Sequence, residues 1–163
     1  INCMGNVLHG LIGTGLASLS DDQQAVARRI MITIGCEVVR VALALGICIE
    51  SIWDIPAQEF ADASSQEDIQ GLIDQLKANT APLRISPEQI EHLGVPPRPS
   101  LLQDVMKGRR TEVEYLNGYV AKTGAEVGVE TPMNYAIAEL MRRQEAGEIE
   151  PSPANLERLQ THL

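Results

Sequence analysis

Aromatic side chains are scarce in this sequence of 163 residues. It holds one tryptophan, one phenylalanine and three tyrosines, only 3% of the chain, whereas 44% of its residues are hydrophobic. Leucine, isoleucine, valine and alanine must therefore fill most of the interior, and this composition favours closely packed helices. The length is within the usual size of one domain and is sufficient to bury a core without disulfide or metal staples.

Positive charge is also in short supply. Thirteen lysines and arginines face 22 acidic residues, which gives a formal net charge of −9 at pH 7. No uniformly basic face of the kind that follows a phosphate backbone is visible, so nucleic acid is not an expected partner. The sequence has no run of about 18 apolar residues and opens with no signal segment. We therefore expect a soluble, cytoplasmic protein without a membrane span.

Cysteine is too sparse to form a framework. Cys3, Cys36 and Cys48 are odd in number, show no C-x-x-C spacing and lie in apolar helical patterns. This argues against both a disulfide scaffold and a zinc site. We expect reduced core residues, with a reactive thiol as the alternative. The three histidines are too scattered to suggest a metal triad or the base of a nucleophile.

Strand signals are absent as well, and no internal repeat occurs, so the predicted fold class is all-α, a helical bundle. The clearest pattern covers 21–49, where apolar residues recur every three or four positions, the spacing of one helix face. Asp21 or Asp22 can cap its start. Such a helix would run roughly 40 Å at 1.5 Å per residue and form the spine of the domain.

Further helices are predicted on both sides of this one. The first residues already show helical spacing with no capping residue ahead of them, so we expect the chain to begin inside an element, as a domain cut from a larger protein would. A proline-rich connector is predicted over 80–99. The other predicted helices cover 58–78, a short 87–93, 100 onward with a capping box of Ser100 and Gln103, 111 or 112 to 127 with Gly128 as its cap, 133–146 with Pro132 in its first turn, and 152–160.

Two asparagines near the start of the chain are candidate ligand-binding residues. Asn2 and Asn6 are four residues apart, a spacing that places both amides on one face of a helix. Each amide offers donors and an acceptor, which suits a small polar ligand with hydroxyl and carboxylate groups. The alternative is that both side chains bond neighbouring helix ends, where asparagine is common.

Glu112 is a candidate for the same site. It stands at a predicted helix start, where the helix dipole favours a carboxylate, and it shares a face with Leu116, Tyr119 and Val120, which would direct it towards the core side. It would either cap its own helix or accept a hydrogen bond from a hydroxyl or a catalytic ammonium.

The stretch 98–110 reverses the charge of the chain. It holds four cations, Arg98, Lys107, Arg109 and Arg110, against the single acid Asp104. A local charge that opposes the overall sign suggests an anion site. The alternative is that these cations pair with the acidic helix predicted over 58–78, or with solvent. The G-x-G at 13–15 does not predict dinucleotide binding, because no strand precedes it.

Four segments between Ser100 and Asn134 closely resemble the C-terminal signature of ketopantoate reductases. They are Ser-Leu-Leu-Gln-Asp at 100–104, Gly-Arg-Arg-Thr-Glu at 108–112, Glu-Tyr-Leu-Asn-Gly at 114–118 and Gly-Val-Glu-Thr-Pro-Met-Asn at 128–134. Asn2-x-x-x-Asn6 resembles the paired asparagines of that family. The resemblance therefore reaches from the first residues to about Leu140.

This resemblance implies a helical bundle of the 6-phosphogluconate dehydrogenase C-terminal type, in an NADPH-dependent reductase that converts 2-dehydropantoate to pantoate in pantothenate biosynthesis. Residues 1–163 would be the substrate-binding domain, and the N-terminal Rossmann domain that binds most of the NADP(H) would be absent. The implied partners are a small 2-keto acid and that Rossmann domain of the same protein; a homodimer is a further expectation.

By the same resemblance, Asn2 and Asn6 would hold the substrate and Ser100 would bind its carboxylate. Glu112 would lie at the active centre and contact the cofactor and the catalytic amine.

Two departures from the family pattern affect these expectations. The family's proton-donating lysine falls four residues before the first asparagine, upstream of Ile1, so residues 1–163 alone are expected to be inactive. A third substrate-binding asparagine aligns near Leu16, which leaves the 2-keto acid open, and the long segment between Trp53 and Pro99 suggests a divergent branch. The alternatives are a family domain that acts on another 2-keto acid, or a helical interaction or dimerisation module without catalysis.

Overall fold

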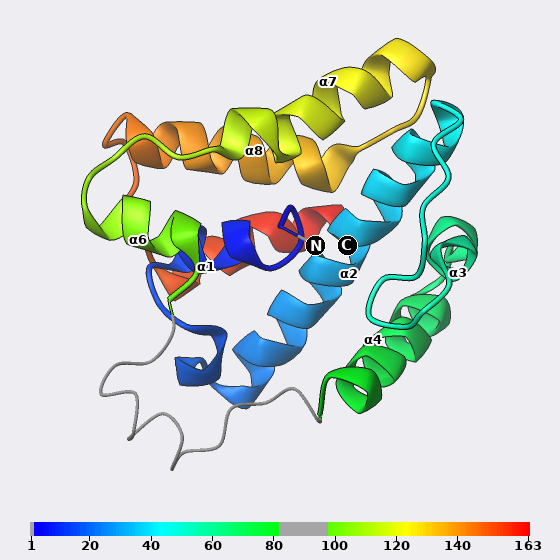
Figure 1. The fold of residues 1–163 in the computed structure, drawn as a ribbon. Coiled ribbons are helices and arrows are strands. Elements are labelled where there is room, and N and C mark those ends of the chain that lie inside the picture. The colour runs from blue at the N-terminus through cyan, green and yellow to red at the C-terminus, as the bar shows by residue number, and fades with distance from the viewer. Residues whose placement is uncertain (1, 82–97) are drawn as a thin grey trace.

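The computed structural model describes residues 2–81 and 98–163, and it confirms the predicted all-α fold (Figure 1). Within these ranges the only extended pairing is an isolated antiparallel bridge between Ile52 and Ile55. The α-helices are α1 (Asn6–Ile12), α2 (Asp21–Ala44), α3 (Ala57–Asp62), α4 (Gln66–Thr80), α6 (Ser100–Met106), α7 (Asn117–Val127) and α8 (Pro132–Glu145). Three 3₁₀ helices, η1 (Leu16–Ser18), η3 (Val113–Tyr115) and η4 (Pro153–His162), complete the described elements.

Helix α2 is the spine of the domain, as predicted. It packs against α3, α4, α7, α8 and η4, and it crosses the molecule diagonally in Figure 1. Between Ile30 and Val41 its buried residues lie on more than one face, because neighbouring elements cover it on several sides. The single apolar stripe predicted from the sequence therefore understates how deeply this helix is buried.

Both ends of α2 differ from the prediction. The start is capped by Ser20 and not by Asp21 or Asp22: the Gln23 backbone N–H donates to Ser20 Oγ at 3.3 Å, and the Ser20 N–H donates to Gln23 Oε1 at 3.2 Å. The helix ends at Ala44, five residues before the predicted end, because Gly46 adopts a left-handed φ of 73°. A left-handed glycine redirects the chain while its N–H bonds the last carbonyls of the helix.

The predicted burial of the cysteines holds only in part. All three are free; Cys36 is buried in α2 and Cys3 is half-buried, but Cys48 follows the end of α2 and is exposed. Burial raises the pKa of the Cys36 thiol to about 11, so this thiol stays protonated and unreactive at neutral pH. The placement of Cys48 in the core was wrong because the helix assumed to bury it ends earlier.

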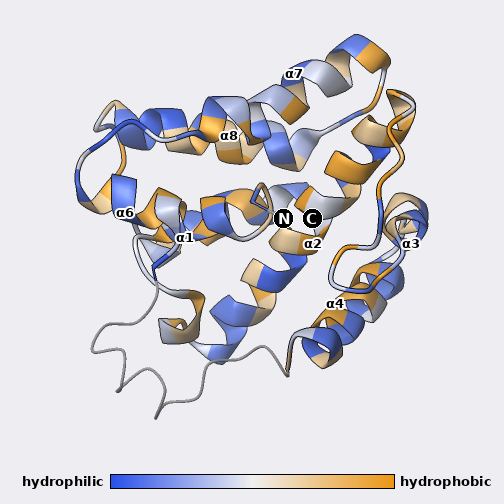
Figure 2. Cartoon of the chain, in the orientation of Figure 1, coloured by the Kyte–Doolittle hydropathy of each residue, from blue (hydrophilic) through white to orange (hydrophobic). Residues whose placement is uncertain are grey.

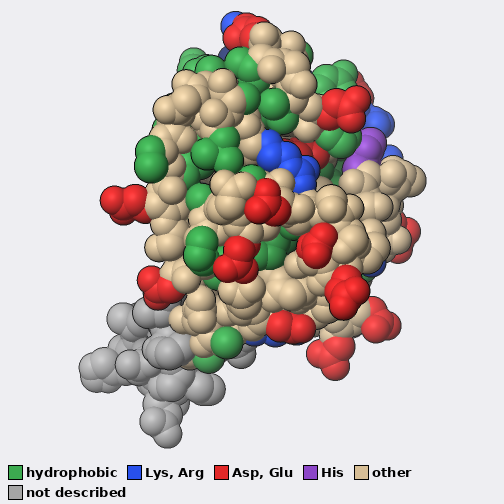
Figure 3. All heavy atoms as spheres, turned by 90° about the vertical axis from the view of Figure 1, so that its right-hand side faces the viewer, with side chains coloured by type: hydrophobic (Ala, Val, Ile, Leu, Met, Phe, Trp, Pro, Cys, Tyr) green, Lys and Arg blue, Asp and Glu red, His purple; other side chains and the backbone are tan. Residues whose placement is uncertain are grey.

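The single helix predicted over 58–78 is in fact two helices, α3 and α4. The Arg40 guanidinium of α2 donates to the carbonyls of Ala61 and Ala63, where α3 ends and its last carbonyls lack helical partners. Ser65 and Asp68 then form a capping box that starts α4. The acidic outer surface predicted here is present, and acidic side chains are spread over this side of the molecule in Figure 3. Its exposed members are Glu59, Asp62, Glu67, Asp68 and Asp74.

The later elements follow the prediction at two of their turns. Gly128 caps α7 in the left-handed conformation, and Pro132 is the first residue of α8. The helix predicted from 111 or 112 begins only at Asn117, after the short η3, and the last element is a 3₁₀ helix. The short helix predicted at 87–93 lies outside the described residues.

One apolar core of buried hydrophobic residues joins these elements. Figure 2 shows hydrophobic and hydrophilic residues alternating along the helices that enclose it. Helix α1 packs closely on α6, and Gly10 permits this approach because a Cβ at that position would clash with the side chain of Leu101. This close crossing brings the start of α1 next to the start of α6. None of the described helices has the length and hydrophobicity that crossing a membrane requires.

A buried carboxylate connects α2 to α8. Glu37, 3% exposed, accepts hydrogen bonds from the backbone N–H groups of Met133 and Asn134, both at 2.8 Å, and from Asn134 Nδ2 at 2.7 Å. These bonds satisfy N–H groups in the first turn of α8, which its own N-cap residue does not bond. Burial raises the pKa of Glu37, and the bonds from Met133 and Asn134 oppose that rise.

We predict that Glu37→Gln lowers the free energy of unfolding by about 2–3 kcal/mol, because the new amide nitrogen must face a backbone N–H in a buried site. Urea denaturation followed by circular dichroism measures this change. The control is Glu126→Gln at an exposed residue of α7, paired with Lys122 at 3.9 Å, which should alter stability by less than about 0.5 kcal/mol. Equal effects of the two variants would contradict the role given to Glu37.

Candidate functional site

Two of the four predicted site residues, Asn6 and Ser100, are in direct contact. Asn6 Nδ2 donates to Ser100 Oγ at 2.9 Å, although the residues are 94 positions apart in sequence. Asn6 Oδ1 accepts from the backbone N–H of Leu101 at 3.2 Å. The Asn6 amide therefore bonds both a serine side chain and the backbone of the first turn of α6.

The capping box predicted for Ser100 and Gln103 is wrong. Ser100 is the first residue of α6 and its side chain caps no backbone N–H; the side chain of Gln103 donates instead to the carbonyl of Arg98 at 2.9 Å. Asn6 from α1 supplies the capping oxygen in place of Ser100. This frees the Ser100 hydroxyl for other partners, and its side chain is exposed.

Asn2 lies in a turn that precedes α1, and not on the same helix face as Asn6, because α1 begins only at Asn6. It is exposed. The turn is attached to α7, since Asn117 Nδ2 donates to the carbonyl of Cys3 at 3.1 Å. Asn2 is thus next to a peptide group whose position is fixed by Asn117 of α7. Asn117 follows Glu112 by five residues in the sequence.

Glu112 does not point towards the core. It is exposed, it precedes η3 and not an α-helix, and it caps no N–H with its side chain. The prediction of a core-facing carboxylate failed because the helical spacing with Leu116 and Tyr119 does not hold across the irregular backbone at Leu116. The carboxylate forms no hydrogen bond with another described residue, and so it remains open to an external partner.

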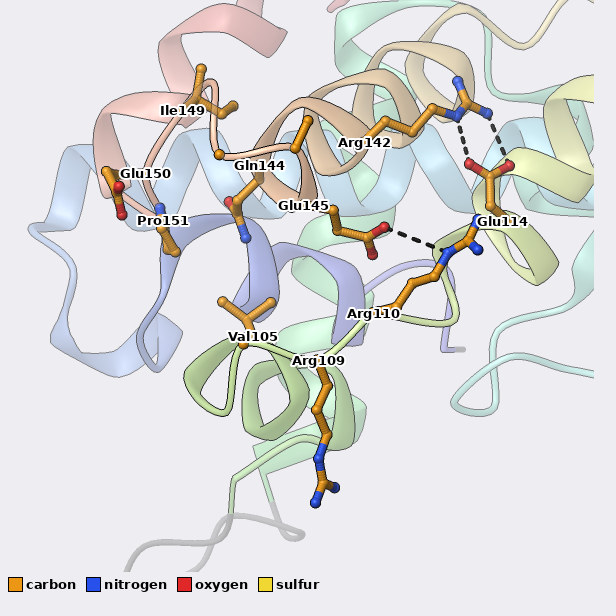
Figure 4. A pocket seen from close by; sticks show the side chains of 13 residues that line it. Val105, Arg109, Arg110, Glu114, Arg142, Gln144, Glu145, Ile149, Glu150 and Pro151 are labelled. Atoms are coloured by element: carbon orange, nitrogen blue, oxygen red, sulfur yellow. Dashed lines mark hydrogen bonds and ion pairs between the residues drawn. The ribbon is translucent and has the colours of Figure 1, made fainter.

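The cations of the basic stretch do not pair with the acidic α3 and α4. Arg109 Nη1 lies 3.9 Å from Asp104 Oδ1, and Arg110 Nε lies 4.0 Å from Oε2 of Glu145 in α8. Both arginines line a pocket of about 650 Å³ between the ends of α6 and α8 (Figure 4), whose wall also carries Arg142. Arg142 is already bonded by Glu114 at 2.5 and 3.1 Å. None of the four predicted site residues lines this pocket, and its wall mixes both charge signs.

The sequence alone assigned no role to a set of buried polar residues that is hydrogen-bonded to Cys3, the residue after Asn2. Asn117 and Asn134, both fully buried, are bonded to each other from Asn117 Nδ2 to Asn134 Oδ1 at 2.9 Å, and Asn134 is bonded in turn to Glu37. One signal could have revealed the set: Glu37 is a charged residue inside the apolar stretch 30–41. No group of three or more metal-ligating side chains occurs within 2–81 or 98–163.

The family of this chain follows from a match to a family model. The model described as "Ketopantoate reductase PanE/ApbA C terminal" matches residues 1–145, which include Asn2, Asn6, Ser100 and Glu112. The chain therefore belongs to the ketopantoate reductase C-terminal family, as the resemblance of its motifs indicated.

Proteins named 2-dehydropantoate 2-reductase are similar to parts of this chain. The one from Archaeoglobus fulgidus is 44% identical over 50 residues, which cover 31% of this chain and 17% of that protein. The one from Pyrococcus abyssi is 41% identical over 47 residues, covering 29% and 16%. The one from Aquifex aeolicus is 39% identical over 62 residues, covering 38% and 18%. The matched segments thus span less than a fifth of these relatives. No solved structure matches the chain.

The double contact of Asn6 leads to a stability prediction. Asn6→Ala should lower the free energy of unfolding by about 1 kcal/mol, because it removes the capping oxygen from Leu101 N–H and the donor to Ser100. Thermal or urea unfolding of the chain measures it. Asn2→Ala, at an exposed position in the same segment, is the control and should change stability by less than about 0.5 kcal/mol. An equally large loss of unfolding free energy in Asn2→Ala would contradict the structural role given to Asn6.

Proposed function

We propose that residues 1–163 form the substrate-binding domain of an NADPH-dependent reductase that converts 2-dehydropantoate to pantoate. Membership of the ketopantoate reductase family and the names of the partial relatives support this activity. The observation that carries the proposal is the contact between Asn6 and Ser100, because it unites two residues that the family resemblance assigns to one substrate.

The Ser100 hydroxyl is suited to a carboxylate ligand. Since Asn6 Nδ2 donates to Ser100 Oγ, that oxygen already serves as an acceptor, and its own hydrogen is left to point outward. A hydroxyl that donates to a carboxylate forms a charge-assisted hydrogen bond, stronger than a neutral one. The remaining N–H of the Asn6 amide, the exposed amide of Asn2 and the Ser100 hydroxyl would then bind the carboxylate and hydroxyl oxygens of a small 2-keto acid.

The described residues are suited to contact only the edge of a bound NADP(H) molecule. Gly13 is the left-handed cap of α1, so the G-x-G at 13–15 ends a helix and does not form a phosphate-binding turn between a strand and a helix. Glu112 is exposed and can accept a hydrogen bond from a cofactor hydroxyl or from an ammonium. Most of the cofactor would be held by a Rossmann domain of the same protein.

This chain would contribute orientation to the reaction. When bound, NADPH supplies a hydride to the keto carbon, while an ammonium group protonates the keto oxygen. Asn2, Asn6 and Ser100 would hold the acid so that its keto carbon faces the cofactor, and Glu112 would hold the ammonium in place. Residues 1–163 alone should accordingly show no oxidation of NADPH.

Self-association without catalysis is the second candidate. Leu43, Leu45 and Ile47 are 40, 44 and 52% exposed at the end of α2, and large apolar side chains exposed together favour contact with another surface. This would give a homodimer through α2. Sedimentation of the chain over a range of concentrations distinguishes a monomer from such a dimer.

The enzymatic proposal is tested in the protein that joins this chain to its nucleotide-binding domain, assayed with NADPH and 2-dehydropantoate. Ser100→Ala should raise KM for the keto acid roughly 10-fold or more, because a hydrogen bond to a charged group contributes about 1.5–3 kcal/mol. Glu112→Gln should mainly lower kcat. Ser51→Ala and Glu126→Gln, at exposed positions outside the site, are matched controls that should leave both constants unchanged.

Two outcomes would count against parts of this proposal. Turnover of another 2-keto acid in place of 2-dehydropantoate would replace the substrate but keep the reductase class. No turnover of any 2-keto acid, together with a stable dimer, would favour the interaction module.

A further inference from the structure

We infer that Asn117 is a positioning residue for the substrate: its amide fixes the peptide group of Cys3, and thereby sets the place of Asn2. This inference rests on the proposed function, in which Asn2 contacts the keto acid. Asn117 does not need to touch the substrate itself, since it is fully buried at the start of α7.

The Asn117 amide acts as a two-pronged donor. Its Nδ2 donates one hydrogen to the Cys3 carbonyl at 3.1 Å and the other to Asn134 Oδ1 at 2.9 Å. Its Oδ1 is buried and has no hydrogen-bond partner among residues 2–81 and 98–163. The opposite orientation of the amide would place Oδ1 against two other oxygens, so the two bonds fix which way it points. A buried acceptor without a partner costs about 1–3 kcal/mol, and an unusual group of this kind calls for an explanation.

The acceptor on the other side of Asn117 is itself held rigidly. Asn134 Nδ2 donates to Glu37 at 2.7 Å and to the Ile34 carbonyl at 3.3 Å, so both of its hydrogens are engaged and its Oδ1 must face Asn117. A continuous set of hydrogen bonds thus runs from Glu37 of α2, through Asn134 and Asn117, to the Cys3 carbonyl. Each side chain in it is at most 3% exposed.

The turn that carries Asn2 needs such a support. Residues 2–5 precede α1, so the helix that places Asn6 does not include Asn2. The side chain of Met4 is buried beside Gly35, which anchors the turn by an apolar contact that does not set the direction of a peptide group. The bond from Asn117 is directional, and it joins the turn at the residue next to Asn2. Loss of that bond should therefore misplace Asn2 more than it disturbs the core.

Asn117→Ala tests this inference, with Asn155→Ala as the matched control. Asn155 is also buried, at 4% exposure, and its amide also donates to two oxygens, the carbonyls of Leu11 at 3.2 Å and Glu150 at 2.9 Å. These bonds lie at the far end of α1 from Asn2. The two variants remove the same chemical group and the same number of hydrogen bonds, so they should lower the free energy of unfolding by similar amounts. Only Asn117→Ala removes the bond to the turn that carries Asn2.

The first readout is hydrogen exchange on the chain of 163 residues. Backbone amides within residues 2–5 should exchange at least about 10-fold faster in Asn117→Ala, and at the wild-type rate in Asn155→Ala. Unchanged exchange in Asn117→Ala would overturn the inference whatever the activity of the protein. If Asn117→Ala fails to fold, Asn117→Ser, whose hydroxyl retains one donor, takes its place in the same comparison.

The second readout is kinetic, in the protein with its nucleotide-binding domain. Asn117→Ala should raise KM for 2-dehydropantoate about 10-fold and leave KM for NADPH unchanged, whereas Asn155→Ala should alter neither. In an Asn2→Ala background, Asn117→Ala should add no further increase in this KM, since the side chain that Asn117 positions is already gone.

Additive effects on KM, or faster exchange without a change in KM, would overturn the link to the substrate. If the wild-type protein reduces no 2-keto acid, the proposed function fails, and with it that link, while the exchange data still decide whether Asn117 holds the turn.

Discussion

The hydrogen bonds that Glu37 accepts in the middle of the protein are the constraint on which much of the remaining architecture depends. A carboxylate in an apolar interior is unfavourable unless its oxygens are bonded, and here three N–H groups at the start of α8 approach it within 2.8 Å. This fixes α8 against the spine α2 at one defined register. The same contact orients Asn134, which orients Asn117, so a bond in the core determines the position of the turn near Asn2.

The candidate site is built in a different way. Asn6 and Ser100 meet at the surface because α1 and α6 cross closely over Gly10, and the polar contact lies at the edge of this apolar packing. The site therefore has one part placed by close helix packing and another, at Asn2, placed by a buried polar network. Glu112 belongs to neither part: it stands on an exposed turn without a partner among the described residues, as a group that acts on an external ligand would.

The pocket with several arginines shows why charge pattern alone is a weak guide to a binding site. Glu145 of α8 faces Arg110 of the basic stretch, and Arg142 on the same pocket wall is engaged by Glu114 and Glu139, so acids from outside 98–110 offset the positive charge of the pocket. The charge excess in the sequence is real, but folding brings acids from elsewhere in the chain beside it. The Ser100 hydroxyl and the amides of Asn2 and Asn6 form the better candidate for a small acid, because each of them has a hydrogen left to donate.

The sequence by itself determined the all-α class, the central helix, the turns at Gly128 and Pro132, and the family. These depend on periodicity, on glycine and proline geometry, and on motifs that are local in the chain. It could not determine that α2 is covered on several faces, that Arg40 bonds the carbonyls at the end of α3, or that Asn6 and not Ser100 caps α6, since each depends on a group from a distant segment. Tertiary structure alone decided that Glu37, Asn134 and Asn117 form one network that reaches Cys3, because a hydrogen bond between residues some 100 positions apart leaves no spacing in the sequence from which it could be read.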